Sequence, residues 1–203
     1  MSSTRLAKTG SGSLRLFNPT YRTNTSIEAF IQDHPVTRAL RANPKFTESR
    51  PHLNGPAMLR DPKLLAGSLA GTQKLSVPPY VFNETNGKRM IVILHVEGDG
   101  CSHPGIIHGG LITTLIDDTF CRCRSAVLPK RVGVTANLNV DFRKPALTQS
   151  YIVLKAEVTR MEGRKSWVEG SIETLELDGG DPSLLAEAKA LFIQPKETEG
   201  LGL

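Results

Sequence analysis

One long amphipathic helix, followed by a series of strands, constrains the fold of this chain most strongly. Residues 109–127 (GGLITTLIDDTFCRCRSAV) place apolar side chains at spacings of three and four, the pattern of a helix with one buried face. Residues 89–96 before this helix have the composition of a strand. Four strand-like runs follow the helix, at 134–142, 151–159, 166–177 and 184–193. This order predicts an α+β fold, in which an antiparallel sheet wraps around one helix.

The first third of the chain is predicted to be an extension of this domain. Residues 27–43 have roughly helical apolar spacing, with a break or kink at Pro35. Residues 44–79 contain six prolines and no lasting periodicity, which is typical of an irregular arm. We therefore expect an N-terminal extension over residues 1–77 and one folded domain over residues 78–203.

The composition excludes several classes of protein. Hydrophobic residues (39%) and charged residues (22%) have the proportions of a soluble globular domain, and no apolar stretch approaches the roughly 20 residues that span a membrane. The net charge of +5 is scattered and aromatic residues make up only 5%, which argues against nucleic-acid binding and suits a phosphate-bearing small molecule. Three cysteines, an odd number, favour a reducing intracellular compartment over a disulfide framework.

Residues 1–26 bear on the location of the protein in the cell. They contain many Ser and Thr residues and no acidic residue, and their basic residues are Arg5, Lys8, Arg15 and Arg22. This composition resembles a mitochondrial transit peptide, but a polar disordered tail has the same composition. We expect the cytosol, slightly ahead of the mitochondrial matrix.

The turn before the long helix and an acid within the helix are the candidate site. His108-Gly109-Gly110 begins the helix, where the first N–H groups have no intrahelical partner and carry partial positive charge. Such a turn is suited to hold the oxygen of a polarised carbonyl. Asp117 lies two to three turns further on, where a desolvated carboxylate needs a function, and carboxylates act as bases or nucleophiles in acyl transfer. Asp118 is expected to be a plain surface or capping acid.

Three segments together resemble a known family. HGGLITTLIDD, RVGVTANLNVDFRKPA and LLAEAKALFIQP occur in the order and spacing of the hotdog-fold acyl-CoA thioesterases, in the branch related to the phenylacetate-pathway and thioesterase-superfamily enzymes, and are most similar to its fungal variants. The resemblance covers about residues 78–195. It implies a homodimer or a dimer of dimers that hydrolyses an acyl thioester to free acid and thiol, with coenzyme A as part of the substrate and no separate cofactor.

The resemblance assigns catalytic roles to positions of this sequence. The His108–Gly109 turn matches the family's oxyanion N–H, and Asp117, nine positions past the histidine, matches its base or nucleophile. Thr135 matches the Ser or Thr that helps to position water. The alternation over residues 134–142 predicts that Thr135 lies on the polar face of its strand.

Four further residues are expected near the substrate. Gly110 completes the turn, and Ser102 stands where the family often has Asn, six residues before the histidine. Serine is shorter and lacks the amide, which bears on the water position or the hydrolysis rate. Arg143 and Lys144 end the strand near where relatives contact the nucleotide end of coenzyme A, and a basic pair suits phosphate.

Other sites built from these residues fit less well. Cys101 with His103 or His108 lacks an identifiable third group to orient a Cys–His nucleophile. The spacing of the two histidines with Asp117 and Asp118 matches no standard metal site, so none is expected.

Three alternative functions share the expected fold. One is release of a polyketide or fatty acyl chain from an acyl carrier protein. Another is a non-catalytic acyl-binding or regulatory dimer, in which Ser102 marks lost chemistry. The third is a dehydratase, which usually needs a catalytic histidine facing an acid, whereas His108 lies in the turn.

Overall fold

The chain folds around a seven-stranded antiparallel sheet with the order β1-β2-β3-β7-β8-β9-β6. The computed structural model describes residues 24–53, 64–85, 87–128, 132–176 and 180–196. The strands of the sheet are β1 (Phe46–Ser49), β2 (Tyr80–Glu84), β3 (Arg89–Val96), β6 (Val134–Phe142), β7 (Ser150–Glu162), β8 (Lys165–Thr174) and β9 (Leu184–Ile193). A separate two-stranded hairpin consists of β4 (Cys101–His103) and β5 (Ile106–Ile107).

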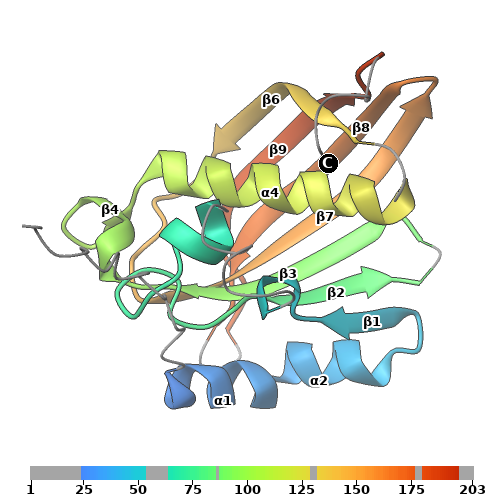
Figure 1. Ribbon diagram of the computed structural model, residues 1–203. Helices are drawn as coiled ribbons and strands as arrows, with labels where there is room; N and C mark the ends of the chain where they lie inside the picture. The colour runs from blue at the N-terminus through green and yellow to red at the C-terminus, as the bar shows by residue number, and fades with distance from the viewer. Residues whose placement is uncertain (1–23, 54–63, 86, 129–131, 177–179, 197–203) are drawn as a thin grey trace, which may run out of the picture.

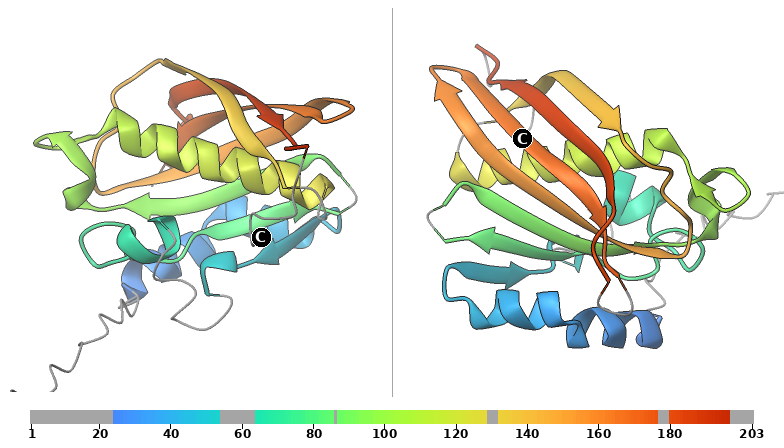
Figure 2. Two further views of the ribbon diagram at one scale, coloured as in Figure 1. Left: turned by 45° about the horizontal axis from the view of Figure 1, so that its top comes forward. Right: turned by 180° about the vertical axis from the view of Figure 1, so that it is seen from behind.

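Helices cover both faces of the sheet. The long helix α4 (Gly109–Val127) crosses one face, and α1 (Thr25–Asp33) and α2 (Pro35–Ala42) pack on the other, beside β1, β2 and β3 (Figure 1, Figure 2). The predicted α+β hotdog architecture, a sheet around one central helix with an N-terminal helical extension, is confirmed. No helix in the described ranges is long and apolar enough to span a membrane.

Most predicted elements of the main domain are present. The bounds of α4, β3, β6 and β9 agree with the predicted ones, and β7 and β8 have shifted ends. Residue 177, the predicted end of β8, and residues 1–23 of the predicted tail lie outside the described residues. In the extension, Pro35 divides the predicted helix in two: it is the first residue of α2, where its missing N–H would have no helical partner anyway.

The arm predicted to be irregular contains a strand. β1 pairs with β2, Phe46 opposite Glu84, and so forms one edge of the sheet. The four residues of β1 are too short a run to show the alternation that identifies a strand from sequence. Residues 54–63 of the same arm lie outside the described residues.

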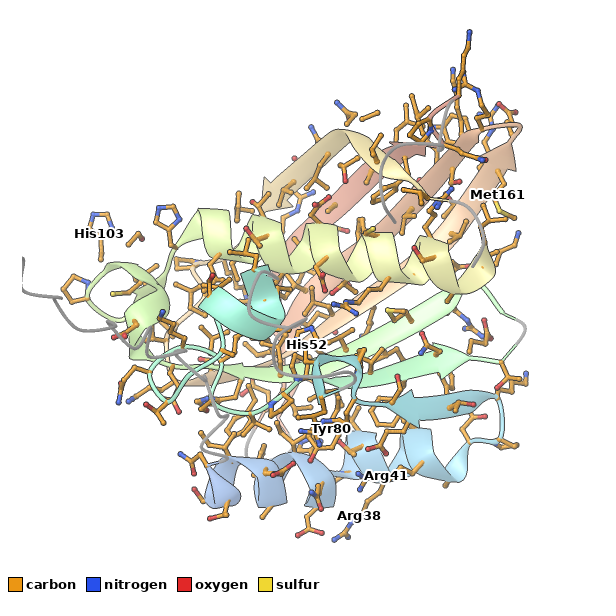
Figure 3. All side chains as sticks on the ribbon, viewed as in Figure 1. Arg38, Arg41, His52, Tyr80, His103 and Met161 are labelled. Carbon is orange, nitrogen blue, oxygen red and sulfur yellow. The ribbon has the colours of Figure 1, made fainter. Side chains whose placement is uncertain are left out.

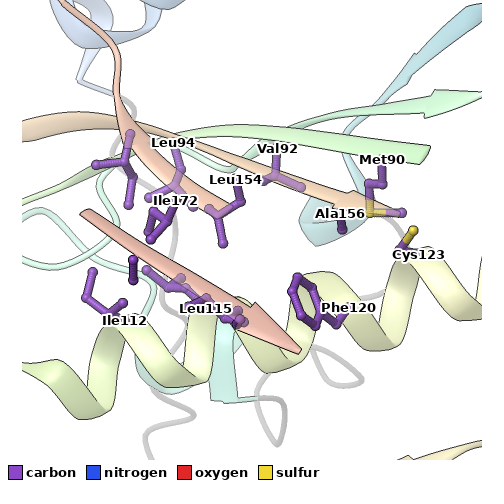
Figure 4. Close-up of a cluster of buried hydrophobic side chains, with 14 of the residues drawn as sticks. Met90, Val92, Leu94, Ile112, Leu115, Phe120, Cys123, Leu154, Ala156 and Ile172 are labelled. Atoms are coloured by element: carbon purple, nitrogen blue, oxygen red, sulfur yellow. The ribbon is translucent and has the colours of Figure 1, made fainter. Parts of the chain in front are cut away.

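The inner face of the sheet and one face of α4 enclose the main hydrophobic core (Figure 4). The stripe that the sequence predicted for the helix is the one that is buried. Its members include Ile112, Leu115, Ile116 and Phe120, and their partners on the sheet include Val92, Leu94, Leu154 and Ile172. Burying a side chain of this size stabilises the fold by about 1.5–3 kcal/mol.

A second core lies on the outer face of the sheet. Ile27 and Ile31 of α1 and Leu40 of α2 pack against outward-facing residues of β2, β3 and β7. Tyr80 joins the two layers: its hydroxyl donates to Glu28, and the Arg50 guanidinium lies over its ring, 3.7 Å from the centroid. The extension therefore packs as a layer of the fold.

Strand β6 forms the other edge of the sheet and is mostly exposed. Only Leu138 and Val140 are partly buried against the main core. Val134 and Phe142 are 48% and 54% exposed. The alternation over residues 134–142 predicts one buried face for this strand, but in a single chain part of that face is exposed.

A β-bulge in β6 changes the face on which Thr135 lies. The pairing with β9 shifts register between Thr135 and Asn137, which makes Ala136 the extra residue. Thr135 consequently shares the side facing α4 with Leu138 and Val140, so the prediction that it lies on the polar face is wrong. Strict alternation fails here because two residues of β6 oppose one residue of β9.

Candidate active site

The His108-Gly109-Gly110 turn caps the N-terminus of α4. The Nδ1 atom of His108 accepts a hydrogen bond from the N–H of Gly110 at 2.8 Å, and the N–H of His108 donates to the carbonyl of Gly100 at 2.7 Å. Within the described residues no hydrogen bond engages the N–H of Gly109. Gly109 therefore offers one N–H, at the positive end of the helix dipole, to a ligand oxygen.

The two glycines of the turn have different surroundings. A Cβ added to Gly110 would lie 2.9 Å from Nδ1 of His108, so the cap needs a glycine there. A Cβ added to Gly109 would lie 3.4 Å from Cζ of Phe142. The sequence did not connect Phe142 with the turn, because alternation alone assigned it to a buried strand face.

Asp117 is paired with a residue from β6. The Oγ1 atom of Thr135 donates to Oδ1 of Asp117 at 2.8 Å. Asp117 is half-buried and Thr135 is exposed. The bulge at Ala136 is what turns the hydroxyl towards the helix, so two of the predicted site residues meet although 18 positions separate them.

Asp118 faces a different side of α4. Arg122, one turn further along, donates through Nε to Asp118 at 2.5 Å. The Arg122 Nη2 atom also lies 3.3 Å from Nε2 of His52, which is buried in the N-terminal arm (Figure 3). Asp118 thus takes part in an ion pair that holds the arm against the helix, and it is separate from the Asp117–Thr135 pair.

Cys121 lies one turn beyond Asp117. Its burial, and then the nearby carboxylates of Asp118 and Asp117, raise the pKa of its thiol. The thiol is therefore protonated at neutral pH and is a weak nucleophile.

A cavity of about 380 Å³ lies beside the turn and brings together four predicted residues: Ser102, Gly109, Arg143 and Lys144. Asp117 and Thr135 are not among its lining residues. At about 1.5 Å per residue, Gly109 and Asp117 are roughly 12 Å apart along the helix axis. One chain therefore does not bring the Gly109 N–H and the Asp117 carboxylate to the same carbonyl group.

The basic pair that lines this cavity is exposed. Arg143 donates through Nε to Glu187 at 2.9 Å, and Lys144 Nζ lies 3.3 Å from the hydroxyl of Ser183. Both side chains lie at the end of β6, with donors that an incoming phosphate can share.

Ser102 and the residues near it lie in the β4–β5 hairpin. Ser102 is exposed, with its Oγ 3.4 Å from Nδ1 of His103 (Figure 3). Among the described residues no group of three or more His, Cys, Asp or Glu side chains is arranged to hold a metal ion.

Comparisons with known proteins identify the family of this chain. The family model of the thioesterase superfamily matches residues 104–177, which include the turn, α4, β6 and β7. An uncharacterised protein of Schizosaccharomyces pombe is 31% identical over 164 residues, which cover 80% of this chain and 90% of that protein. The chain therefore belongs to the thioesterase superfamily.

Two further relatives are matched over only part of their length. A mitochondrial protein of Candida albicans, itself uncharacterised, is 36% identical over 131 residues, 64% of this chain and 59% of that protein. The mouse acyl-coenzyme A thioesterase THEM4 is 37% identical over 101 residues, 50% of this chain and 39% of THEM4. This chain thus spans less than two thirds of both proteins.

A solved structure shares the fold. The acyl-CoA hydrolase of Staphylococcus aureus, in complex with butyryl coenzyme A, coenzyme A and coenzyme A disulfide, superimposes with a TM-score of 0.51 and 20% identity. The match covers 55% of this chain and 68% of the hydrolase.

Proposed function

We propose that this chain is a thioesterase that hydrolyses an acyl-CoA, or a related acyl thioester, to the free acid and thiol. The observation that carries the proposal is the hydrogen bond from Thr135 to the half-buried carboxylate of Asp117. A half-buried carboxylate on a helix with one apolar face, in a superfamily of thioesterases, is suited to activate water or to attack a carbonyl carbon.

The proposed reaction follows from these groups. With Asp117 as base, the carboxylate takes a proton from water as the water oxygen bonds to the carbonyl carbon. The carbonyl oxygen gains negative charge and accepts a hydrogen bond from the N–H of Gly109. The carbon–sulfur bond then breaks, and the proton passes to the leaving thiolate. With Asp117 as nucleophile, its carboxylate oxygen bonds to the carbonyl carbon and the carbon–sulfur bond breaks, which gives a mixed anhydride and the thiolate. Water then hydrolyses the anhydride to the free acid and the Asp117 carboxylate, and the proton released from water passes to the thiolate.

We propose that the site is shared between the two chains of a homodimer. The roughly 12 Å along one helix between Gly109 and Asp117 exceeds the reach of a single carbonyl, which needs about 3 Å to each group. Two α4 helices that run antiparallel about a two-fold axis place Gly109 of one chain near Asp117 of the other, twice. The exposed edge strand β6, with Val134 and Phe142 uncovered, is the surface proposed for this contact.

The substrate is proposed to enter along the cavity beside the turn. Arg143 and Lys144 are proposed to bind phosphate groups of coenzyme A, and they line the same cavity as Ser102. A carrier protein would present the same phosphopantetheine arm to this pair, without the nucleotide phosphates.

The experiment that tests this function is a titration of released thiol with a panel of acyl-CoA substrates. Asp117→Ala should lower kcat by a factor of about 100 or more and change KM much less. Asp118→Ala is the matched control and should keep most activity, because Asp118 contacts Arg122. Equal losses from both variants would indicate a paired-carboxylate site.

The same assay separates the alternatives. A carrier-dependent enzyme would act slowly on every free acyl-CoA and quickly on the carrier-loaded chain. A binding protein would bind acyl-CoA saturably and release no thiol at all, which would refute the proposed hydrolysis. Ser102→Asn should be tolerated if serine only takes the place of the family's asparagine.

Complementation tests the shared site. Proline is accepted at the first position of a helix and has no N–H, so Gly109→Pro removes the proposed donor. Mixed with Asp117→Ala chains, it should restore roughly a quarter of wild-type activity, since half of the dimers are mixed and each has one intact site. If both variants fold and exchange but no activity returns, the shared site is disproved.

We also propose a mitochondrial location. The sequence alone slightly favours the cytosol, but the name of the Candida albicans relative favours mitochondria, and the basic, Ser- and Thr-rich composition of residues 1–26 is compatible with a transit peptide. Fluorescent fusions of the full chain and of a chain without residues 1–23 would test this. An unchanged distribution after truncation would refute the transit role.

A further inference from the structure

A buried polar cluster at the end of β3 is not used by the proposed chemistry. It consists of Ser76, His95 and Glu97, which are 1%, 4% and 9% exposed. The hydroxyl of Ser76 donates to Oε1 of Glu97 at 3.0 Å, and the same oxygen lies 3.7 Å from Nδ1 of His95. The ring of Tyr151 packs on His95 with centroids 4.6 Å apart. Polar groups this deep need a structural or functional reason.

The cluster lies on the face of the sheet opposite α4. His95 lies opposite Tyr151 on the outer face of the sheet, which it shares with Ile93, whereas Leu94 and Val96 face α4. The sheet therefore separates His95 from the helix that carries the proposed catalytic acid.

His95 does contact the loop that carries the basic pair. Gln149 directly precedes Ser150, which pairs with Val96, so the end of this loop lies beside His95. Burial lowers the pKa of His95, and the nearby Gln149 backbone partly opposes that shift. Gln149 has a φ of 57°, a left-handed conformation that costs a non-glycine residue about 1 kcal/mol or more. The contact thus supports a strained residue at the end of the 143–149 loop, which begins with Arg143 and Lys144.

The same loop is attached to the turn before α4. The carbonyl of Ala146 accepts from the N–H of Ile107 at 2.8 Å, and the carbonyl of Gly105 accepts from Thr148 at 3.0 Å. Ile107 immediately precedes His108. One side of the turn is therefore held by the loop that His95 supports.

Glu97 supports the other side of the turn. It follows β3 directly and leads into the Gly98–Gly100 turn, whose last carbonyl accepts from the N–H of His108 at 2.7 Å. The N–H of Glu97 itself donates to Lys74 at 2.8 Å, and its carboxylate is fixed by Ser76. The segments before and beside the turn thus meet in one cluster.

We propose that His95 and Glu97 are positioning residues, which hold the His108–Gly109 turn and the 143–149 loop in the arrangement that binds and hydrolyses the thioester. The predicted effect on thioester hydrolysis rests on the proposed function. The predicted effect on the turn and the loop rests on the contacts alone. The titratable groups that face His95 are Glu97 and Tyr151.

Amide hydrogen exchange and acyl-CoA hydrolysis together test the proposal. His95→Phe keeps the ring packing on Tyr151 and removes the polar contact with Gln149. Exchange in residues 105–110 and 143–149 should become about tenfold faster, and kcat/KM should fall about tenfold. His95→Gln, which keeps a side-chain N–H, should recover most of both values.

Tyr80→Phe is the matched control on the same face of the sheet. It removes the bonds of a buried hydroxyl to Glu28 and Gln32, far along the chain from the turn, and should leave exchange in residues 105–110 and 143–149 unchanged. Equal acceleration in this variant would mean general destabilisation and would overturn the proposal.

The outcomes separate the two proposals. A wild-type chain that hydrolyses no thioester refutes the function, while the exchange data still test the positioning. Wild-type exchange of both segments in His95→Phe overturns the positioning, whatever the activity. If His95→Phe does not fold, Ser76→Ala, which releases the Glu97 carboxylate, should accelerate the same segments about threefold. No change in that variant also overturns the proposal.

Discussion

Replacing Thr135 by valine isolates the hydrogen bond on which the proposed chemistry depends. Valine has the size and branching of threonine, and it removes only the hydroxyl that donates to Asp117 at 2.8 Å. A hydrogen bond to a charged group contributes about 1.5–3 kcal/mol. Because Thr135 is exposed, the lower end applies, and about 1.4 kcal/mol corresponds to a tenfold change in rate.

We therefore expect Thr135→Val to lower kcat about tenfold, with KM changed by less than about twofold. The assay is thiol release from acyl-CoA at saturating substrate, with thermal unfolding measured alongside. Thr135→Ser is the matched control, since it keeps the hydroxyl and should retain most activity. Full kcat in a folded Thr135→Val protein, or an equal loss in Thr135→Ser, would refute the role of this bond.

Two further predictions concern stability. At Gly170 in β8 an added Cβ would overlap the backbone oxygen of Lys155 and lie 2.8 Å from Phe120. Gly170→Ala should therefore lower the free energy of unfolding by about 3 kcal/mol and Tm by about 6–12 °C. A Tm shift under about 3 °C would contradict this close packing. Burial lowers the pKa of His95, partly opposed by Glu97, so the folded state favours the neutral ring. The resulting stability is present above about pH 6.5 and is lost as pH falls towards the lower folded pKa. The free energy of unfolding, measured with denaturant, should therefore fall more over this range for the wild type than for His95→Phe. Equal pH dependence in the two proteins would refute the prediction.

The elements of the main domain could be predicted because their signals are local. The spacing of Ile112, Leu115, Ile116 and Phe120 defines a helix face wherever the helix packs, and the predicted bounds of α4 and β6 agree with the structure. The glycine pair at the start of α4 and the acid within the helix could be singled out in the same way, from the chemistry of a helix N-terminus and of a carboxylate on a helix with a buried face. The strand β1 could not, because four residues carry too little periodicity and its place depends on pairing with β2.

The sequence by itself determined which residues were candidates, and the tertiary structure decided which of them meet. Thr135 reaches Asp117 only because the bulge at Ala136 shifts the register of β6 against β9, and alternation along one strand cannot reveal an insertion relative to its partner. The contact of His95 with Gln149 likewise joins segments 54 positions apart, from 95 to 149. Local periodicity depends on neighbours along the chain, whereas these contacts depend on register and packing between strands, which form only when the whole sheet closes around α4.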